Sequence, residues 1–488
     1  MSGAAQRVED QKDLSVRFPR QSARGVLLGF SGPRAGVLIA AVLIVIFTLA
    51  AHGGITGVLF TGVVLWGPLM ASAFVRVQGR PVIEWAPVWL HWRARQAAGQ
   101  AEYRGRLIDT PRPAGTLALP GEGASLRFLV DEKTQICCVH DPWHQTLCAV
   151  LGVSHSAFAL LSPDQQGQRV WGWGRALAAL GNNPSIAAVQ VLEAVVADPG
   201  TAIQQWWAEH GDHAEGFPAR AYDDLLNRTS LASSTHRTLI ALALDMKAAA
   251  KAIAQAGGGV TGAARVLAGD MAAFEQSLRA ADLRVDHWLG ADELAAVIRS
   301  AYDPAAVLTA SPGADIAHAG PIAVSEHWDR LHTDSGWAAV LWISEWPRID
   351  VPPSFLHQLV FAPGVRRTFS IIARPLSTSA ALRQIRKEKT SIIADQAQKA
   401  KVGQVQSLSD LQEYRDVESR EQALIAGHAD VEFVGLVAVS APSEGDLEAA
   451  VASIERAAGQ AGCETRVLFG QQSQGFLAAA LPLARRIW

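Results

Sequence analysis

Two uncharged apolar runs near the N-terminus constrain this chain more than any other feature. The first is "AGVLIAAVLIVIFTLAAH" (residues 35–52), and the second is "VLFTGVVLWGPLMASAFV" (residues 58–75), with the short turn "GGITG" between them. A helix needs about 20 apolar residues to cross a hydrocarbon core of about 30 Å. The two runs therefore predict a transmembrane helical hairpin over residues 35–75.

The flanks of the hairpin predict its orientation. Arginine and lysine residues occur before the first run and after the second, whereas the connecting turn carries no charge. Cationic flanks favour the cytoplasmic side. The sequence thus predicts a multi-pass protein of the inner (cytoplasmic) membrane with both termini in the cytoplasm and a basic cytoplasmic segment at residues 1–34. A cleaved signal peptide is the alternative, and the second apolar run disfavours it.

The segment that follows the second run, residues 76–104, contains "RVQGRPVIEWAPVWLHWRAR". Its three tryptophans are spaced about one helical turn apart, and aromatic and basic side chains are typical of the membrane–water boundary. We therefore expect an amphipathic interfacial segment in contact with the lipid bilayer. Its expected membrane-interface residues are Arg76, Arg80, Trp85, Trp89, Trp92, Arg93 and Arg95.

Composition limits the remaining part of the chain. With 488 residues, a net charge of −3 and four cysteines, the protein has neither a basic field for nucleic acid nor a disulfide framework. Direct nucleic-acid binding is therefore not expected, and the cysteines fit a reducing compartment.

The pattern downstream predicts an α/β (α+β) cytosolic region with ferredoxin-like units. Residues 105–123 are rich in proline and glycine and predict a linker. A first α/β unit is expected at residues 124–305 and a second at residues 315–488. The second ends in a strand, an amphipathic helix capped by Ser443, and a final strand. A split βαβ arrangement has this element order.

Two motifs suggest catalysis, and each has a simpler interpretation. The glycines of "GGGVTG" (residues 257–262) follow a helix instead of a strand, so they predict a helix-to-helix connection and no dinucleotide site. Cys138 and His140 would share one face of a strand while Cys137 points to the other, which disfavours a zinc site. The sequence contains no Gly-Lys pair and so no Walker A loop. We therefore expect no cofactor, no metal and no enzymatic activity.

A long charged helix is expected from about residue 379 to beyond residue 400. Such a charge run is commonly a solvated face, and a partner-docking surface is the alternative. The possible docking residues are Arg383, Arg386, Lys387 and Lys389.

Two stretches carry a resemblance to known families. The hairpin with "GRPVIEWAPVWLHWRAR" resembles the PrgI-like inner-membrane proteins of conjugation and type IV secretion systems. The segment "LRAADLRVDHWLGADELAAVIRSAYDP" and the ending "GQQSQGFLAAALPLARR" resemble the N-terminal, non-catalytic domain of the assembly ATPase of those systems. The EccE component of type VII secretion is also similar, because it joins two N-terminal spans and a tryptophan-rich exit to a cytosolic α/β region.

The first resemblance implies a non-enzymatic inner-membrane scaffold that docks a separate P-loop ATPase and other inner-membrane subunits of a conjugation machine. The resemblance to EccE implies a structural component of type VII secretion. A membrane-tethered enzyme with an unmarked site, and DNA handling through the basic helix, are further alternatives.

Overall fold

The computed structural model describes residues 18, 32–52, 65–77, 79–105, 113–154, 158–197, 201–211, 216–229, 234–305, 315–401, 408–425 and 429–485. The chain divides into two compact units. One unit comprises residues 1–19, 102–468 and 472–488, and the other comprises residues 20–101 and 469–471.

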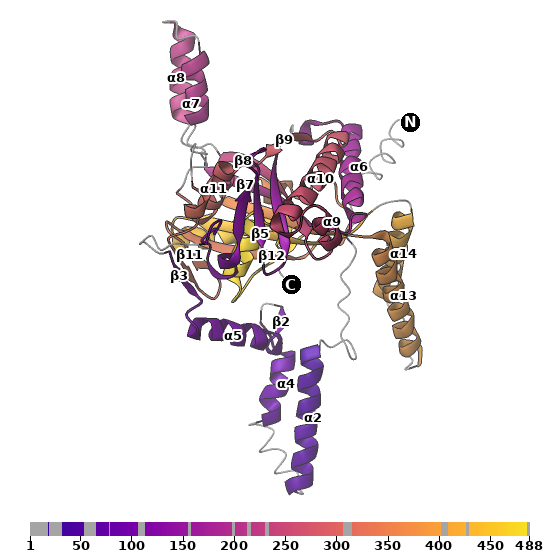
Figure 1. Ribbon diagram of the computed structural model, residues 1–488. Coiled ribbons are helices and arrows are strands. Elements are labelled where there is room, and N and C mark those ends of the chain that lie inside the picture. The colour runs from indigo at the N-terminus through magenta and orange to yellow at the C-terminus, as the bar shows by residue number, and fades with distance from the viewer. Residues whose placement is uncertain are drawn as a thin grey trace, which may run out of the picture. The chain divides into compact units, whose positions relative to one another are not determined.

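The larger unit is built on a 13-stranded sheet whose neighbouring strands pair antiparallel (Figure 1). Its strand order is β3-β10-β11-β12-β14-β13-β7-β8-β6-β5-β4, with β15 paired to β12 and β9 paired to β6. The strands are β3 (Glu102–Arg104), β4 (Arg127–Val130), β5 (Cys137–Asp141), β6 (Thr146–Ser154), β7 (Ile186–Ala197), β8 (Ser234–Asp245), β9 (Arg284–Trp288), β10 (Ala323–Glu326), β11 (Leu331–His332), β12 (Trp337–Glu345), β13 (Arg366–Leu376), β14 (Asp430–Ala441) and β15 (Glu464–Val467).

Helices pack on both faces of this sheet. The helices of the larger unit are α6 (Pro163–Gly181), α7 (Thr201–His210), α8 (Phe217–Thr229), α9 (Ala250–Gln255), α10 (Gly259–Ala280), α11 (Ala291–Tyr302), α12 (His357–Val360), α13 (Thr378–Lys401), α14 (Leu408–Ile425), α15 (Glu444–Gln460) and α16 (Gln472–Ala480). Short 3-10 turns are η2 (Gly121–Ser125), η3 (Phe158–Leu160) and η5 (Ile316–His318). Helices α11 and α16 share a core with one face, whereas α6 and α10 on one side and α15 on the other cover the opposite face.

The alternating direction of side chains along each strand supplies residues to the cores on both faces of the sheet. Cys137 belongs to the core beneath α11 and α16, whereas its neighbour Cys138 belongs to the core beneath α6 and α10. The prediction that these two thiols point to opposite faces is confirmed. Because successive side chains of a strand face opposite ways, a sheet covered on both faces needs apolar residues at nearly every position. The buried run of β6 from Leu147 to Gly152 has this pattern.

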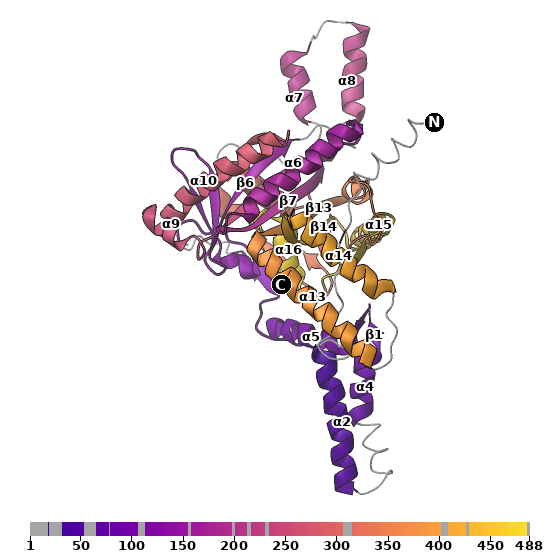
Figure 2. The same cartoon turned by 90° about the vertical axis from the view of Figure 1, so that its right-hand side faces the viewer.

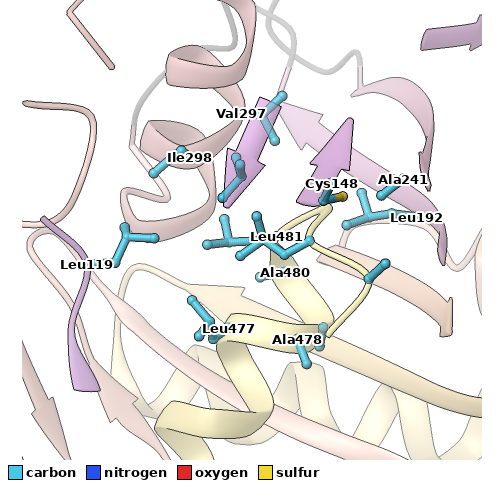
Figure 3. Packing of buried hydrophobic residues seen from close by; sticks show 14 of the residues in the cluster. Leu119, Cys148, Leu192, Ala241, Val297, Ile298, Leu477, Ala478, Ala480 and Leu481 are labelled. Atoms are coloured by element: carbon cyan, nitrogen blue, oxygen red, sulfur yellow. The ribbon is translucent and has the colours of Figure 1, made fainter. Parts of the chain in front are cut away.

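Helix α16 lies at the centre of the largest core. Leu477, Ala478, Ala480 and Leu481 pack beside Leu192 of β7 and Cys148 of β6 (Figure 3). Gln190 of β7 is fully buried and holds the end of this helix, because its Nε2 lies 2.9 Å from the carbonyl of Ala478 and 3.0 Å from that of Leu481.

The smaller unit consists of α2 (Gly32–His52), α4 (Gly67–Phe74), the two-residue strands β1 (Arg76–Val77) and β2 (Arg80–Pro81), and α5 (Val82–Ala97). Among the residues described, no helix has the length and apolarity that a membrane crossing demands. The predicted transmembrane hairpin at residues 35–75 is therefore wrong, and with it the multi-pass membrane localisation. The second apolar run forms only the eight-residue α4 in the described part.

The predicted fold class also needs correction within the larger unit. One extended antiparallel sheet joins strands from both of the ranges that were expected to be ferredoxin-like units, because β13 of the second range pairs with β7 of the first. The protein is thus a mixed α/β structure with a large antiparallel sheet.

Most local predictions agree with the structure. Alternation in "HRTLIALALDM" favours a strand at residues 236–246, which corresponds to β8, and the helix expected at residues 291–302, closed by "YDP", is α11. Ser443 caps α15, as expected, by accepting a hydrogen bond from the backbone N–H of Asp446. Helix α14 was not expected as a separate element, and residues 106–112 of the predicted linker lie outside the described residues.

Candidate docking surface

Helices α13 and α14 form a helical hairpin with a small core of its own, and they lie side by side in Figure 2. Ala381, Ile385 and Ile392 of α13 pack against Val417 and Leu424 of α14. On each helix the buried positions recur at intervals of four or seven residues, which places them on one stripe. The remaining faces of both helices are left for charged residues.

Ion pairs extend the contact between the two helices. Lys389 of α13 donates a hydrogen bond to Glu421 of α14, and this bond raises the pKa of the lysine. Arg420 of α14 pairs with Glu388 at 3.1 Å and with Asp430, at the start of β14, at 2.7 Å. Lys389, one of the predicted docking residues, therefore takes part in the contact between α13 and α14.

The other three predicted docking residues have a different environment. Arg383, Arg386 and Lys387 are exposed, and their spacing of three and four residues puts them on one face of α13. They lie opposite the buried stripe of Ile385 and Ile392. Because three like charges on one turn of helix repel one another, this face favours an acidic partner surface.

The predicted membrane-interface residues belong to the smaller unit. Arg76 and Arg80 lie on β1 and β2, and the other five lie on α5. Trp85 packs edge-on against Phe469 with ring centroids 5.5 Å apart and donates a hydrogen bond to the carbonyl of Val77 at 3.1 Å. Its indole is therefore engaged inside the unit.

The remaining residues of this set lie further along α5. The guanidinium of Arg93 lies 5.4 Å from the ring centre of Trp89 and 6.0 Å from that of Trp92, and Arg95 donates a hydrogen bond to the carbonyl of Gly470. Trp89 is 47% exposed, so α5 presents one tryptophan stacked on an arginine at its surface. The interfacial role predicted for these residues stays a prediction.

The other motifs have structural explanations. Gly257, Gly258 and Gly259 connect α9 to α10 and all have positive φ angles, which glycine adopts without strain. Burial raises the pKa of Cys137 and of Cys138 to about 12, so neither thiol is reactive at neutral pH. No group of three or more metal-ligating side chains is found within the described part of the chain.

Sequence reasoning missed one polar feature of the larger unit. Arg237 lies near the start of β8 and Arg366 is the first residue of β13, and both line a small cavity on the sheet face beneath α11. An arginine inside a run such as "HRTLIALALD" was the available signal, because charged residues are rarely buried without a partner.

Comparison with known families gives one match. Residues 232–343 match the family model described as "Putative type VII ESX secretion system translocon, EccE". The matched segment begins just before β8 and ends within β12, so it includes α9, α10, β9, α11, β10 and β11. A search of curated proteins finds no match. The family match supports the type VII alternative, and the conjugation hypothesis receives no support from it.

Proposed function

We propose that this chain is a non-enzymatic structural component of a type VII secretion system. The observation that carries the proposal is the EccE match over residues 232–343, which covers α11 and four strands of the central sheet. These elements contribute to the main core, so the similarity concerns the scaffold of the larger unit.

The proposed role is to bind other subunits of the secretion complex. The exposed basic face of α13, formed by Arg383, Arg386 and Lys387, is the proposed contact surface. Its partner would present acidic side chains, because opposite charges across an interface speed encounter and set register. A separate P-loop ATPase of the same machine is the first subunit to test as this partner.

Co-purification from a host that carries a type VII secretion locus tests the proposal. The tagged full chain is expected to recover subunits of that secretion complex. A triple variant with R383E, R386E and K387E should recover them at a tenth or less of the wild-type yield, because the substitutions reverse the charge of the basic face. A charge-matched control with K133E, K247E and K251E changes exposed lysines elsewhere and should retain the wild-type yield.

Two outcomes would contradict the proposal. Recovery of no secretion subunit by the wild-type chain would remove the assignment to type VII secretion. Equal recovery by both triple variants and the wild type would leave the assignment and remove the basic face of α13 as the contact.

A further inference from the structure

A cavity of about 20 Å³ lies on the sheet face that α11 covers. Arg237 of β8, Ala194 of β7, Thr368 of β13 and Ala438 of β14 form one row across four neighbouring strands, as the strand register shows. All four residues line the cavity. The alanines at the middle and end of the row leave the space that a larger side chain would fill.

The roof and the second row of the cavity add further short or polar side chains. Ala301 and the buried Ser300 of α11 line it, as does Ala480 of α16. Ser440 of β14 pairs in register with Arg366 of β13, so this arginine and serine form the adjacent row. The lining of the cavity thus combines alanines and larger apolar residues with three arginines, Arg237, Arg366 and Arg367, and three hydroxyl side chains.

The charge of Arg366 is not balanced by a close carboxylate. Its guanidinium donates hydrogen bonds to the carbonyls of Pro304, at 2.9 Å, and of Ser300, at the C-terminal end of α11. Burial lowers the pKa of Arg366, and the negative charge of Asp303 offsets this effect in part. No ion pair within the described chain includes Arg366 at 4.0 Å or less.

The positive charge of Arg237 is balanced only weakly by a carboxylate. The nearest Glu293 oxygen lies 3.9 Å from its Nη2, at the outer limit of an ion pair. Burial also lowers the pKa of Arg237, again with a partial offset from Glu293. Arg367, the next residue along β13, donates instead to the carbonyls of Val360, Ala362 and Val365, so it does not share these carboxylates.

We propose that this cavity binds one small carboxylate between Arg237 and Arg366. Guanidinium groups bind carboxylates in a planar, two-bonded geometry, and the hydroxyls of Thr368 and Ser440 can donate further hydrogen bonds to an anion. The volume corresponds to about one or two water-sized groups. This size fits a carboxylate head group and excludes a nucleotide.

The shared chemistry allows two sources of the ligand. A free small carboxylate is one, and the side-chain carboxylate of a bound partner chain is the other. The site does not depend on the proposed secretion role, since it is built from residues of the sheet, α11 and α16.

Saturation-transfer NMR on the full chain tests the proposal, with sodium acetate as the free ligand and N-acetyl-glutamate amide as the side-chain mimic. At least one of the two is expected to show saturable transfer from the wild-type protein. Acetate binding indicates a free carboxylate, and binding of the glutamate mimic alone indicates a partner side chain. Absence of saturable transfer for both would overturn the proposal.

Variants locate the binding in the cavity. R237Q removes one charge, and A194V fills the centre without changing charge, so each should weaken binding at least tenfold. T368V keeps the shape and removes one hydroxyl, and a loss of threefold or more is expected. R284Q, at an exposed arginine of β9, is the matched control and should bind as the wild type does. Undiminished binding by A194V and T368V, with melting curves confirming that both are folded, would also overturn the proposal.

Discussion

Gln190 satisfies four polar groups at a fully buried position. Its Nε2 contacts the hydroxyl of Ser370 at 2.7 Å and two carbonyls at the end of α16, and its Oε1 accepts a hydrogen bond from the backbone N–H of Ala484 at 2.6 Å. We expect Q190L to lower the free energy of unfolding by about 2–4 kcal/mol, because several buried groups would lose their partner at once. Urea unfolding followed by circular dichroism measures this loss.

A second variant separates the network from the loss of a single bond. S370A removes only the hydroxyl that Gln190 contacts, so it should cost about 1 kcal/mol. Equal losses for Q190L and S370A would show that the contacts to the C-terminal segment contribute nothing.

Asp270 of α10 carries a carboxylate that is only half satisfied. Asn183 donates to its Oδ1 at 2.7 Å, whereas its Oδ2 is buried without a hydrogen-bond partner. Burial raises the pKa of this carboxyl group in the folded state. The folded state therefore holds the proton more tightly than the unfolded state, and the free energy of unfolding falls as pH rises above the unfolded-state value of about 3.9.

We expect D270N to remove this pH dependence. At pH 7 the variant should be as stable as the wild type or more stable by up to about 1 kcal/mol, since Asp270 is partly solvated. Urea unfolding at pH 5 and pH 7.5 gives the difference, and E455Q, at an exposed carboxylate of α15, is the control. A variant that is less stable than the wild type at pH 7.5 would contradict the argument.

At the scale of elements, α6 and α10 approach closely at one glycine. A Cβ atom on Gly172 of α6 would lie 2.7 Å from the Cβ and 2.8 Å from the Cα of Ala281, just after α10. Because the obstacle includes backbone, G172A should lower the free energy of unfolding by about 1–3 kcal/mol. Thermal and urea unfolding measure the effect.

Gly174, two residues along the same helix, is the matched control. A Cβ atom there would meet nothing within 4 Å. G174A should therefore stabilise the protein by about 0.5–1 kcal/mol through helix propensity alone. If both substitutions changed stability in the same direction, close packing at Gly172 would not be the cause.

Periodicity and capping predicted the elements that carry a strong local signal. The helix expected at residues 291–302 is α11 and the strand expected at residues 236–246 corresponds to β8, and the expected glycine connection between α9 and α10 is also present. Helix α16 has no amphipathic stripe because it is buried all round, so its sequence pattern did not indicate which face packs against the core. Helix α14 was hidden because a long polar segment resembles a continuation of α13.

The candidate surfaces also differ in how far a local sequence pattern could predict them. The face of α13 could be located from spacing, but the ion pair that removes Lys389 from it depends on α14. The cavity beneath α11 could not be located at all, since its row joins residues from β8, β7, β13 and β14. No local sequence pattern reveals the register between strands that are far apart in the sequence.

At the scale of the whole molecule, the pairing of β7 with β13 joins the two halves of the larger unit into one sheet. Eleven positions of β13 pair with β14, and seven of them also pair with β7, so the two ranges that were expected to be separate units share a continuous ladder. The apolar runs near the N-terminus were assigned from composition alone, and the helices described there do not have the required form. Composition predicts burial of a segment, but it does not identify the environment that buries it.

The architecture also predicts which segments the larger unit can lose. Strands β7 and β8 pair antiparallel up to Ala197 and Ser234, so residues 198–233, which contain α7 and α8, are inserted between two adjacent strand ends. Replacing them with a two-residue Asn-Gly turn should close an ordinary hairpin. We expect the free energy of unfolding to change by no more than about 1 kcal/mol.

Removal of residues 472–488 should have the opposite outcome, although it deletes fewer residues. Seven residues of α16 are buried, including Phe476 and Leu477, and the helix fills the centre of the largest core. Its loss would leave an apolar cavity and would remove the partners of the buried Gln190. The free-energy cost of these two effects together exceeds the usual free energy of unfolding of a domain. The truncated chain should show no cooperative urea transition, whereas the turn replacement should unfold in a single transition. Cooperative unfolding of the truncated chain would show that the sheet is stable without its central helix.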